Sequence, residues 1–141
     1  MRASSLLAFK CCFFAAICTM PSCALYDSYM MAKFDGHEYH MIAQIRTDSE
    51  LAKLKCNSVE ISRNNVVALN TKAKQLSNYS EFIPHNENTR QLSDNLYKLT
   101  DSTLTFYNNN ANVSETFCKL KFDQITRAAT TIQEVVGKRP R

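Results

Sequence analysis

The chain is poor in glycine and proline, the residues that most often break helices and form turns. It has two glycines and three prolines in 141 residues. Beyond Cys23 they stand near the ends of the chain and at one break in the middle: Gly36, Pro84, Gly137 and Pro140. An antiparallel sheet of this length would need several turns, which are normally rich in both residue types. Their scarcity predicts a helical fold.

The sequence also lacks the features of several functional classes. It has no Gly-rich phosphate loop, no Gly-x-Ser-x-Gly, no Cys-x-x-Cys and no haem-attachment motif. No acidic pair stands against an apolar background, as glycosidases require. Past the leader, 15 basic side chains (17 less Arg2 and Lys10) face 13 acidic ones, which is not the basic stripe of a nucleic-acid-binding protein. We expect no enzyme, no cofactor and no nucleic-acid partner.

The chain does begin with a recognisable leader. Residues 1–10 carry Arg2 and Lys10, residues 11–20 form an apolar run, and Pro21-Ser22-Cys23 closes it. A charged start, a short apolar core and small residues at the exit are typical of an export signal. Ten residues rise about 15 Å as a helix, half of a bilayer core of about 30 Å, and no later run is long enough to span. The leader therefore predicts a signal peptide over 1–22.

Met20-Pro21-Ser22-Cys23 resembles the lipobox of bacterial lipoproteins, in which a small residue precedes a cysteine that becomes lipidated and N-terminal. The resemblance implies a covalent lipid, such as palmitate, on Cys23 and anchorage in membrane lipid. Ala24 is not the aspartate of inner-membrane retention, so the resemblance implies a periplasm-facing lipoprotein of the outer membrane. Alternatively, Ser22-Cys23-Ala24 fits ordinary signal peptidase cleavage, which would release a soluble secreted protein that starts at Leu25.

Four later segments repeat apolar or small side chains every three or four residues, the spacing of one buried helix face. We predict helices at about 37–56 and 59–81, a third with Asn88 as its N-cap, and a fourth that begins at Asn112 and ends at Gly137. The four predicted buried faces are Ile42, Ile45, Ser49, Ala52, Cys56 and Val59; Val59, Val66, Leu69, Ala73 and Leu76; Leu92, Leu96, Leu99, Thr103 and Phe106; and Cys118, Phe122, Ile125, Ala129, Ile132 and Val136.

Four helices with short connections predict an all-α fold, an antiparallel four-helix bundle after a cleaved signal peptide. The expected organisation is a lipid-anchored tether at 23–36, a bundle at 37–137 and a basic tail at 138–141. In this topology Cys56, at the end of the first helix, and Cys118, near the start of the fourth, lie at the same end of the molecule. We predict a disulfide between them, because exported proteins reside where disulfides persist. The alternative is two buried free thiols.

Three histidines suggest a metal site as a further alternative. His37 and His40 are one helical turn apart, and His85 lies in the connection expected at the same end of the bundle. With Glu38 or Glu87 as a fourth ligand, they could hold Zn²⁺ or Cu²⁺. The competing interpretation is three solvated surface histidines.

Aromatic residues gather near the predicted helix ends, where they serve either as interface anchors or as core at the bundle ends. They are Tyr26, Tyr29, Phe34, Tyr39, Tyr79, Phe82, Tyr97 and Tyr107. The basic tail is either a solvated end or a contact for anionic lipid or polymer.

Together these features predict a small exported lipoprotein that binds or scaffolds an envelope protein partner without catalysis. A soluble secreted helical factor and a periplasmic metal-binding bundle are the alternatives. In architecture the chain also resembles phage-type envelope proteins, namely superinfection-exclusion lipoproteins and the outer-membrane partners of lysis spanins.

Overall fold

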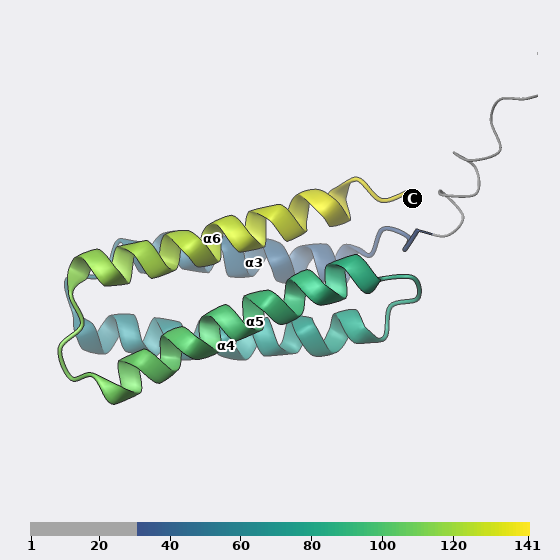
Figure 1. Ribbon diagram of the computed structural model, residues 1–141. Coiled ribbons are helices and arrows are strands. Elements are labelled where there is room, and N and C mark those ends of the chain that lie inside the picture. Colours follow the sequence, from purple (N-terminus) through teal and green to yellow (C-terminus); the bar gives the residue numbers. More distant parts are fainter. Residues whose placement is uncertain (1–30) are drawn as a thin grey trace, which may run out of the picture. The chain divides into compact units, whose positions relative to one another are not determined.

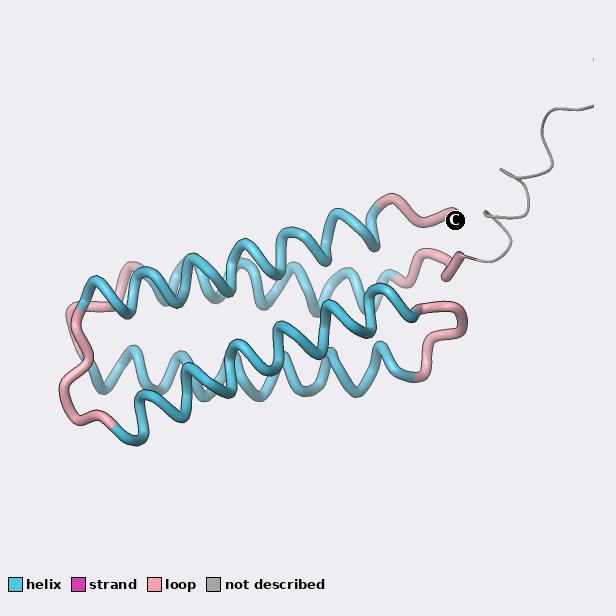
Figure 2. Tube along the Cα trace, in the orientation of Figure 1, coloured by secondary structure: helices cyan, strands magenta, loops and turns pink. Residues whose placement is uncertain are grey.

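Four antiparallel helices make up the bundle (Figure 1). The structure, a computed structural model, describes residues 31–141, and Cys23 and the leader lie outside them. The helices are α3 (Gly36–Lys53), α4 (Val59–Glu81), α5 (Glu87–Asn109) and α6 (Glu115–Gly137). Short loops join them, and no strand occurs between residues 31 and 141 (Figure 2). The predicted all-α four-helix bundle is confirmed.

The helix starts follow from local capping. Asp35 accepts hydrogen bonds from the backbone N–H groups of His37 and Glu38 at the start of α3. Ser58 caps α4, with Ile61 N–H as donor. Such side chains satisfy backbone donors that have no partner within the helix.

The predicted caps of the last two helices were wrong by two residues each. Ser114, not Asn112, caps α6 by accepting from Phe117 N–H, because Val113 packs into the core and the helix starts only after it. Asn86, not Asn88, precedes α5, and its side chain makes no capping bond.

Three of the four predicted buried faces are confirmed almost throughout. The core contains Ile42, Ile45, Ala52, Cys56, Val66, Leu69, Ala73, Leu76, Cys118, Phe122, Ile125, Ala129, Ile132 and Val136, as predicted. Ser49 is buried as well, while Val59 is only partly buried and packs against the core. The first helix ends at Lys53 rather than 56, so Cys56 lies in the turn that follows.

The predicted face of the third helix is confirmed only in part. Helix α5 buries Leu96 and Thr103 as expected. The other residues that it buries are small and polar, apart from one tyrosine: Thr89, Ser93, Thr100 and Tyr107. Leu92 and Leu99 lie at the flank, and Phe106 is exposed. The Thr100 and Thr103 hydroxyls can face the core because each donates to a backbone carbonyl, of Tyr97 and Leu99 respectively. The Tyr107 hydroxyl is buried on the same face without a hydrogen-bond partner among the described residues.

The bundle consists of two helix pairs. Helix α3 packs mainly on α6, and α4 mainly on α5 (Figure 1). Hydrogen bonds of 2.7 Å between Ser49 and Thr126 and 3.0 Å between Thr100 and Asn70 tie the members of each pair. At one end the chain enters at Ala32 and leaves after α6, and the α4–α5 loop lies there too. The α3–α4 and α5–α6 loops lie at the other end.

Candidate functional site

One end of the bundle carries the predicted disulfide. Cys56 and Cys118 are bonded, with their Cα atoms 5.7 Å apart, and both residues are buried. The bond joins the α3–α4 turn to the first turns of α6 and closes a sequence separation of 62 residues. Neither sulfur is a free thiol in this state. We call this end the disulfide end.

The opposite end carries a buried ion pair that the sequence did not reveal. Glu38, in the first turn of α3, is 0 % exposed, and Arg139, just after α6, is 6 % exposed. Arg139 Nη1 donates to Glu38 Oε2 at 2.6 Å. The two residues are 101 positions apart, and each looks like an ordinary surface residue in the sequence. We call this end the network end.

Hydrogen bonds with residues of α4, the α4–α5 loop and α5 complete this network. Glu38 Oε1 accepts from Ser80 Oγ at 2.8 Å and from Asn86 Nδ2 at 3.0 Å. Arg139 Nη2 donates to Asn86 Oδ1 and to Thr89 Oγ1. Asn86 therefore bridges both charges, which explains why it does not cap α5. A buried pair with such partners holds its surroundings in one arrangement.

The network also fixes the C-terminal residues, so the tail is not simply a solvated end. Phe34 N–H donates to the carbonyl of Pro140 at 2.9 Å, and the Arg141 guanidinium lies 5.4 Å from the centre of the Phe34 ring. Lys138 caps the C-terminus of α6. The segments that precede α3 and follow α6 are thus fastened to each other.

The three candidate metal ligands are all exposed. The ring of His37 meets Tyr79 edge-on at 5.0 Å, His40 Nε2 lies 3.0 Å from Gln44 Nε2, and His85 has a positive φ of 59° in the α4–α5 loop. Across the described part of the chain, no three His, Cys, Asp or Glu side chains come close enough to hold a metal ion. The structure therefore does not gather His37, His40 and His85 into one site.

The aromatic residues divide between the two interpretations. Tyr107 is fully buried, and Phe34, Tyr39 and Tyr97 pack against the core. Phe82 is 83 % exposed. Tyr26 and Tyr29 lie outside the described residues.

A groove between α3 and α4 lies toward the disulfide end. It encloses about 180 Å³, and its lining residues are Asp48, Leu51, Ala52, Lys55, Asn65, Ala68 and Leu69. The Asn65 Nδ2 atom is buried and has no hydrogen-bond partner. Leu51 is more than half exposed beside the groove, and Leu54, in the turn that follows, is 77 % exposed. No pattern in the sequence predicted this groove; Asn65, which lines it, stands in the Asn64-Asn65 pair that interrupts the apolar period of α4.

Comparison of the chain with protein family models, curated proteins and solved structures finds no match. Within residues 31–141, none of the helices combines the length and apolarity needed to cross a bilayer.

Proposed function

We propose that the protein is a small exported lipoprotein, anchored through Cys23, whose bundle binds another envelope protein without catalysis. The observation that carries the proposal is the charged and apolar leader that ends in Ser22-Cys23. The Cys56–Cys118 disulfide supports it, because such bonds persist in oxidising compartments such as the periplasm.

Exposed apolar side chains support the binding role. Leu51, Leu54, Ile61 and Leu120 are each 45 % exposed or more, and all four lie in the half of the bundle that contains the disulfide. Such side chains anchor protein interfaces, and a groove beside them gives a partner a concave seat. The disulfide keeps the α3–α4 turn in place beneath Leu54.

The intact mass of the mature protein, purified from membranes, tests the anchor. We expect a chain that begins at Cys23 with a diacylglyceryl-sized increment, and the loss of this increment in Cys23→Ala. A mass that matches residues 25–141 without lipid would overturn the anchor and support the secreted factor. Native mass spectra with added Zn²⁺ or Cu²⁺, compared with His40→Ala, test the metal-binding alternative.

Crosslinking in cells tests the binding role. If the partner docks at the disulfide end, Leu54→Asp should abolish a crosslinked species that the wild type forms. Phe82→Asp is the matched control, because it places the same charge at an exposed apolar position at the other end. Equal loss in both variants, or in neither, would contradict docking at the disulfide end.

A further inference from the structure

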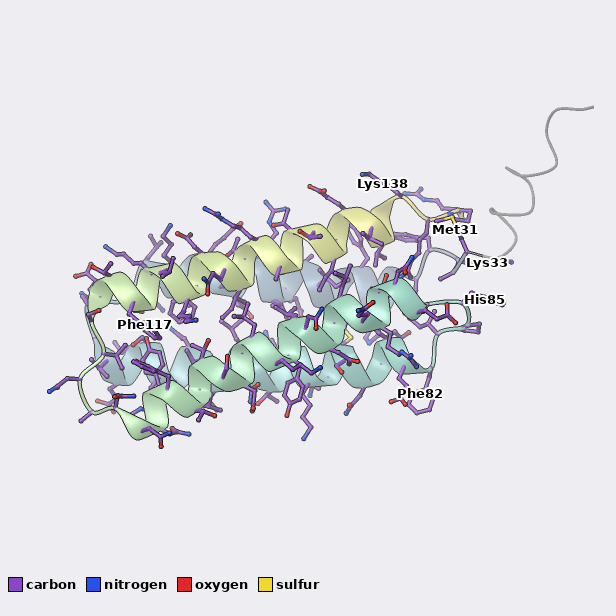
Figure 3. All side chains as sticks on the ribbon, viewed as in Figure 1. Met31, Lys33, Phe82, His85, Phe117 and Lys138 are labelled. Atoms are coloured by element: carbon purple, nitrogen blue, oxygen red, sulfur yellow. A yellow bond between two sulfur atoms is a disulfide. The ribbon has the colours of Figure 1, made fainter. Side chains whose placement is uncertain are left out.

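Basic and aromatic side chains share the exposed surface of the network end. Figure 3 shows Lys33, Phe82, His85 and Lys138 at this end, and Phe117 at the other. Arg141 lies here too, over the Phe34 ring. We call Lys33, Phe82, His85, Lys138 and Arg141 the network-end surface. All five residues are exposed.

Phe82 is the most exposed large hydrophobic side chain in residues 31–141, at 83 %. It is the C-cap of α4, and its N–H donates to the carbonyl of Tyr79 at 3.2 Å. This bond fixes its backbone while the ring points away from the core. A ring held outward at the tip of a bundle contributes nothing to packing, but it suits the boundary between lipid headgroups and acyl chains.

The basic side chains of this surface are not neutralised. Lys33, Lys138 and Arg141 form no salt bridge with any described carboxylate, whereas Arg139 is paired with Glu38. Asp35, the acidic residue nearest to Lys33 in the chain, caps α3 and accepts from the Tyr79 hydroxyl at 3.0 Å. The exposed acidic residues Glu81 and Glu87 flank Phe82 and His85 on the α4–α5 side, away from the segments before α3 and after α6 that carry the three basic residues. Positive charge therefore gathers where the chain enters and leaves the bundle.

The length of the tether keeps the network end close to the membrane. Nine peptide steps (32 minus 23) join Cys23 to Ala32, and they reach at most about 32 Å when fully extended. The disulfide end lies farther away by the length of a helix, about 35 Å for the 23 residues of α5. A membrane that holds a lipid on Cys23 is therefore always within reach of the network end.

We propose that the network-end surface rests on an anionic membrane surface, with Phe82 at the lipid interface and Lys33, Lys138 and Arg141 against phosphate groups. This inference rests on the proposed lipid anchor. The inference also extends the proposed function, because the anchored bundle then stands on the membrane and directs the α3–α4 groove away from the lipid. Each basic side chain near an anionic surface should raise membrane partitioning roughly fivefold.

The sequence offers a direct optical test, because it contains no tryptophan. Phe82→Trp gives the lipidated protein a single fluorophore at the network end, and Leu54→Trp is the matched control at an equally open position of the disulfide end. Each variant is placed on vesicles of phosphatidylethanolamine with phosphatidylglycerol, and on vesicles of phosphatidylcholine. On the anionic vesicles, the emission of residue 82 should shift to shorter wavelength and be quenched by brominated lipid. The emission of residue 54 should stay water-like.

Removal of the three charges supplies the second arm. In unlipidated Cys23→Ser protein with Phe82→Trp, changing Lys33, Lys138 and Arg141 to Gln should lower partitioning to anionic vesicles by roughly 100-fold, the product of three fivefold steps. Circular dichroism should show an unchanged bundle, because all three positions are exposed.

The outcomes separate the two proposals. If Cys23 carries lipid but residue 82 remains water-like on anionic vesicles, the anchor stands and the membrane-facing surface is overturned. If Cys23 carries no lipid, the anchor fails, and the unlipidated variants decide the surface by themselves. The proposed membrane-facing surface is overturned if the emission of residue 54 shifts and that of residue 82 does not. It is also overturned if the protein binds phosphatidylcholine vesicles as strongly as anionic vesicles.

Discussion

The two ends of the bundle are closed by different chemistry. A covalent bond, Cys56–Cys118, closes the disulfide end, whereas a buried ion pair with its hydrogen bonds closes the network end. A disulfide stabilises mainly because it restricts the unfolded chain. An ion pair such as Glu38–Arg139 leaves the unfolded chain free, and acts only when its partners meet in the folded state. One end is therefore fastened in every state of the oxidised chain, and the other only in the native state.

The ends also differ in which helices they fasten. The disulfide joins only the α3–α4 turn to α6. The network joins the residues around α3 and α6 to the α4–α5 side as well, through Asn86 and Thr89. Toward the disulfide end, the two helix pairs meet through packing, such as the Phe106–Phe117 stack with ring centres 4.2 Å apart, and through the Lys72–Asp48 salt bridge. The α3–α4 groove lies in this half, where no buried ion pair of the described residues joins the α3–α6 pair to the α4–α5 pair.

The largest effect should come from breaking the ion pair on one side. Arg139→Met leaves the Glu38 carboxylate buried without its cation, which typically costs about 3 to 5 kcal/mol. Urea unfolding at neutral pH measures this loss. Lys138→Met is the control, because it removes the neighbouring exposed charge and should change stability by less than about 0.5 kcal/mol. Similar losses in both variants would contradict the role of the network.

A double variant sharpens this result. Adding Glu38→Gln to Arg139→Met removes the unpaired buried charge, so the double variant should be more stable than Arg139→Met alone. Recovery should be partial, because Asn86 and Thr89 still lose the guanidinium that donates to them. Additive losses would show that the two residues act independently.

The ion pair also shows where prediction from the sequence ends. Periodicity finds faces that bury apolar side chains, and it correctly placed the cores of α3, α4 and α6. Glu38 and Arg139 contribute no apolar signal, and their burial depends on a partner 101 residues away. The α5 face was predicted only in part for a related reason: Ser93 and Thr100 face the core, although Leu92 and Leu99 are more hydrophobic. Those small hydroxyl residues are accepted there because their hydrogen bonds are satisfied, which only the three-dimensional arrangement reveals.

The disulfide is the one long-range contact that the sequence did predict. Its two cysteines were both on predicted apolar faces and at ends that the topology brings together. Because cysteines in an oxidising compartment pair with each other, these two had only one possible partner each. No comparable rule pairs one carboxylate with one guanidinium among 30 charged residues (17 basic plus 13 acidic).

Removing the disulfide should have the next largest effect. Replacement of Cys56 and Cys118 by Ala frees a loop of about 60 residues, and the chain-entropy model gives a loss of about 4 kcal/mol. Urea unfolding of the double variant and of the reduced wild type should agree. The addition of reductant should destabilise Arg139→Met by a similar amount, since the two ends are far apart and their effects should add. A much smaller effect of the reductant on Arg139→Met than on the wild type would show that the contributions of the two ends depend on each other.

Acid should weaken the network end through Asp35. Burial raises the pKa of Asp35, but hydrogen bonds from Glu38 N–H, the Tyr79 hydroxyl and His37 N–H together lower the pKa below the ordinary value of 3.8. A carboxyl group with a lowered folded-state pKa stabilises the protein above its unfolded-state pKa, and this stability is lost as the pH falls through the folded-state value. Asp35→Ala should therefore cost about 1 kcal/mol at pH 7, the usual value for a lost N-cap.

Unfolding measured from neutral pH down to about pH 2 tests this sign. The stability difference between wild type and Asp35→Asn, which keeps a capping oxygen without the charge, should shrink below about pH 4. Tyr79→Phe removes one of the hydrogen bonds that lower the pKa, so its acid limb should begin at higher pH than that of the wild type. If the stability difference between wild type and Asp35→Asn grew as the pH fell, the lowered pKa of Asp35 would be contradicted.

The smallest effect should come from an ion pair at the disulfide end. Lys53 Nζ and Asp123 Oδ1 are 2.7 Å apart between α3 and α6, but their side chains are 40 % and 39 % exposed. Water and salt screen such a pair, so Lys53→Met should cost no more than about 1 kcal/mol, and less at high salt. Arg139→Met makes a comparable substitution at the other end, where burial is the main difference. If Lys53→Met lowered the free energy of unfolding as much as Arg139→Met does, then joining α3 to α6 would be enough to explain the contribution of the network. A small, salt-sensitive loss would instead assign that contribution to the exclusion of water around Glu38.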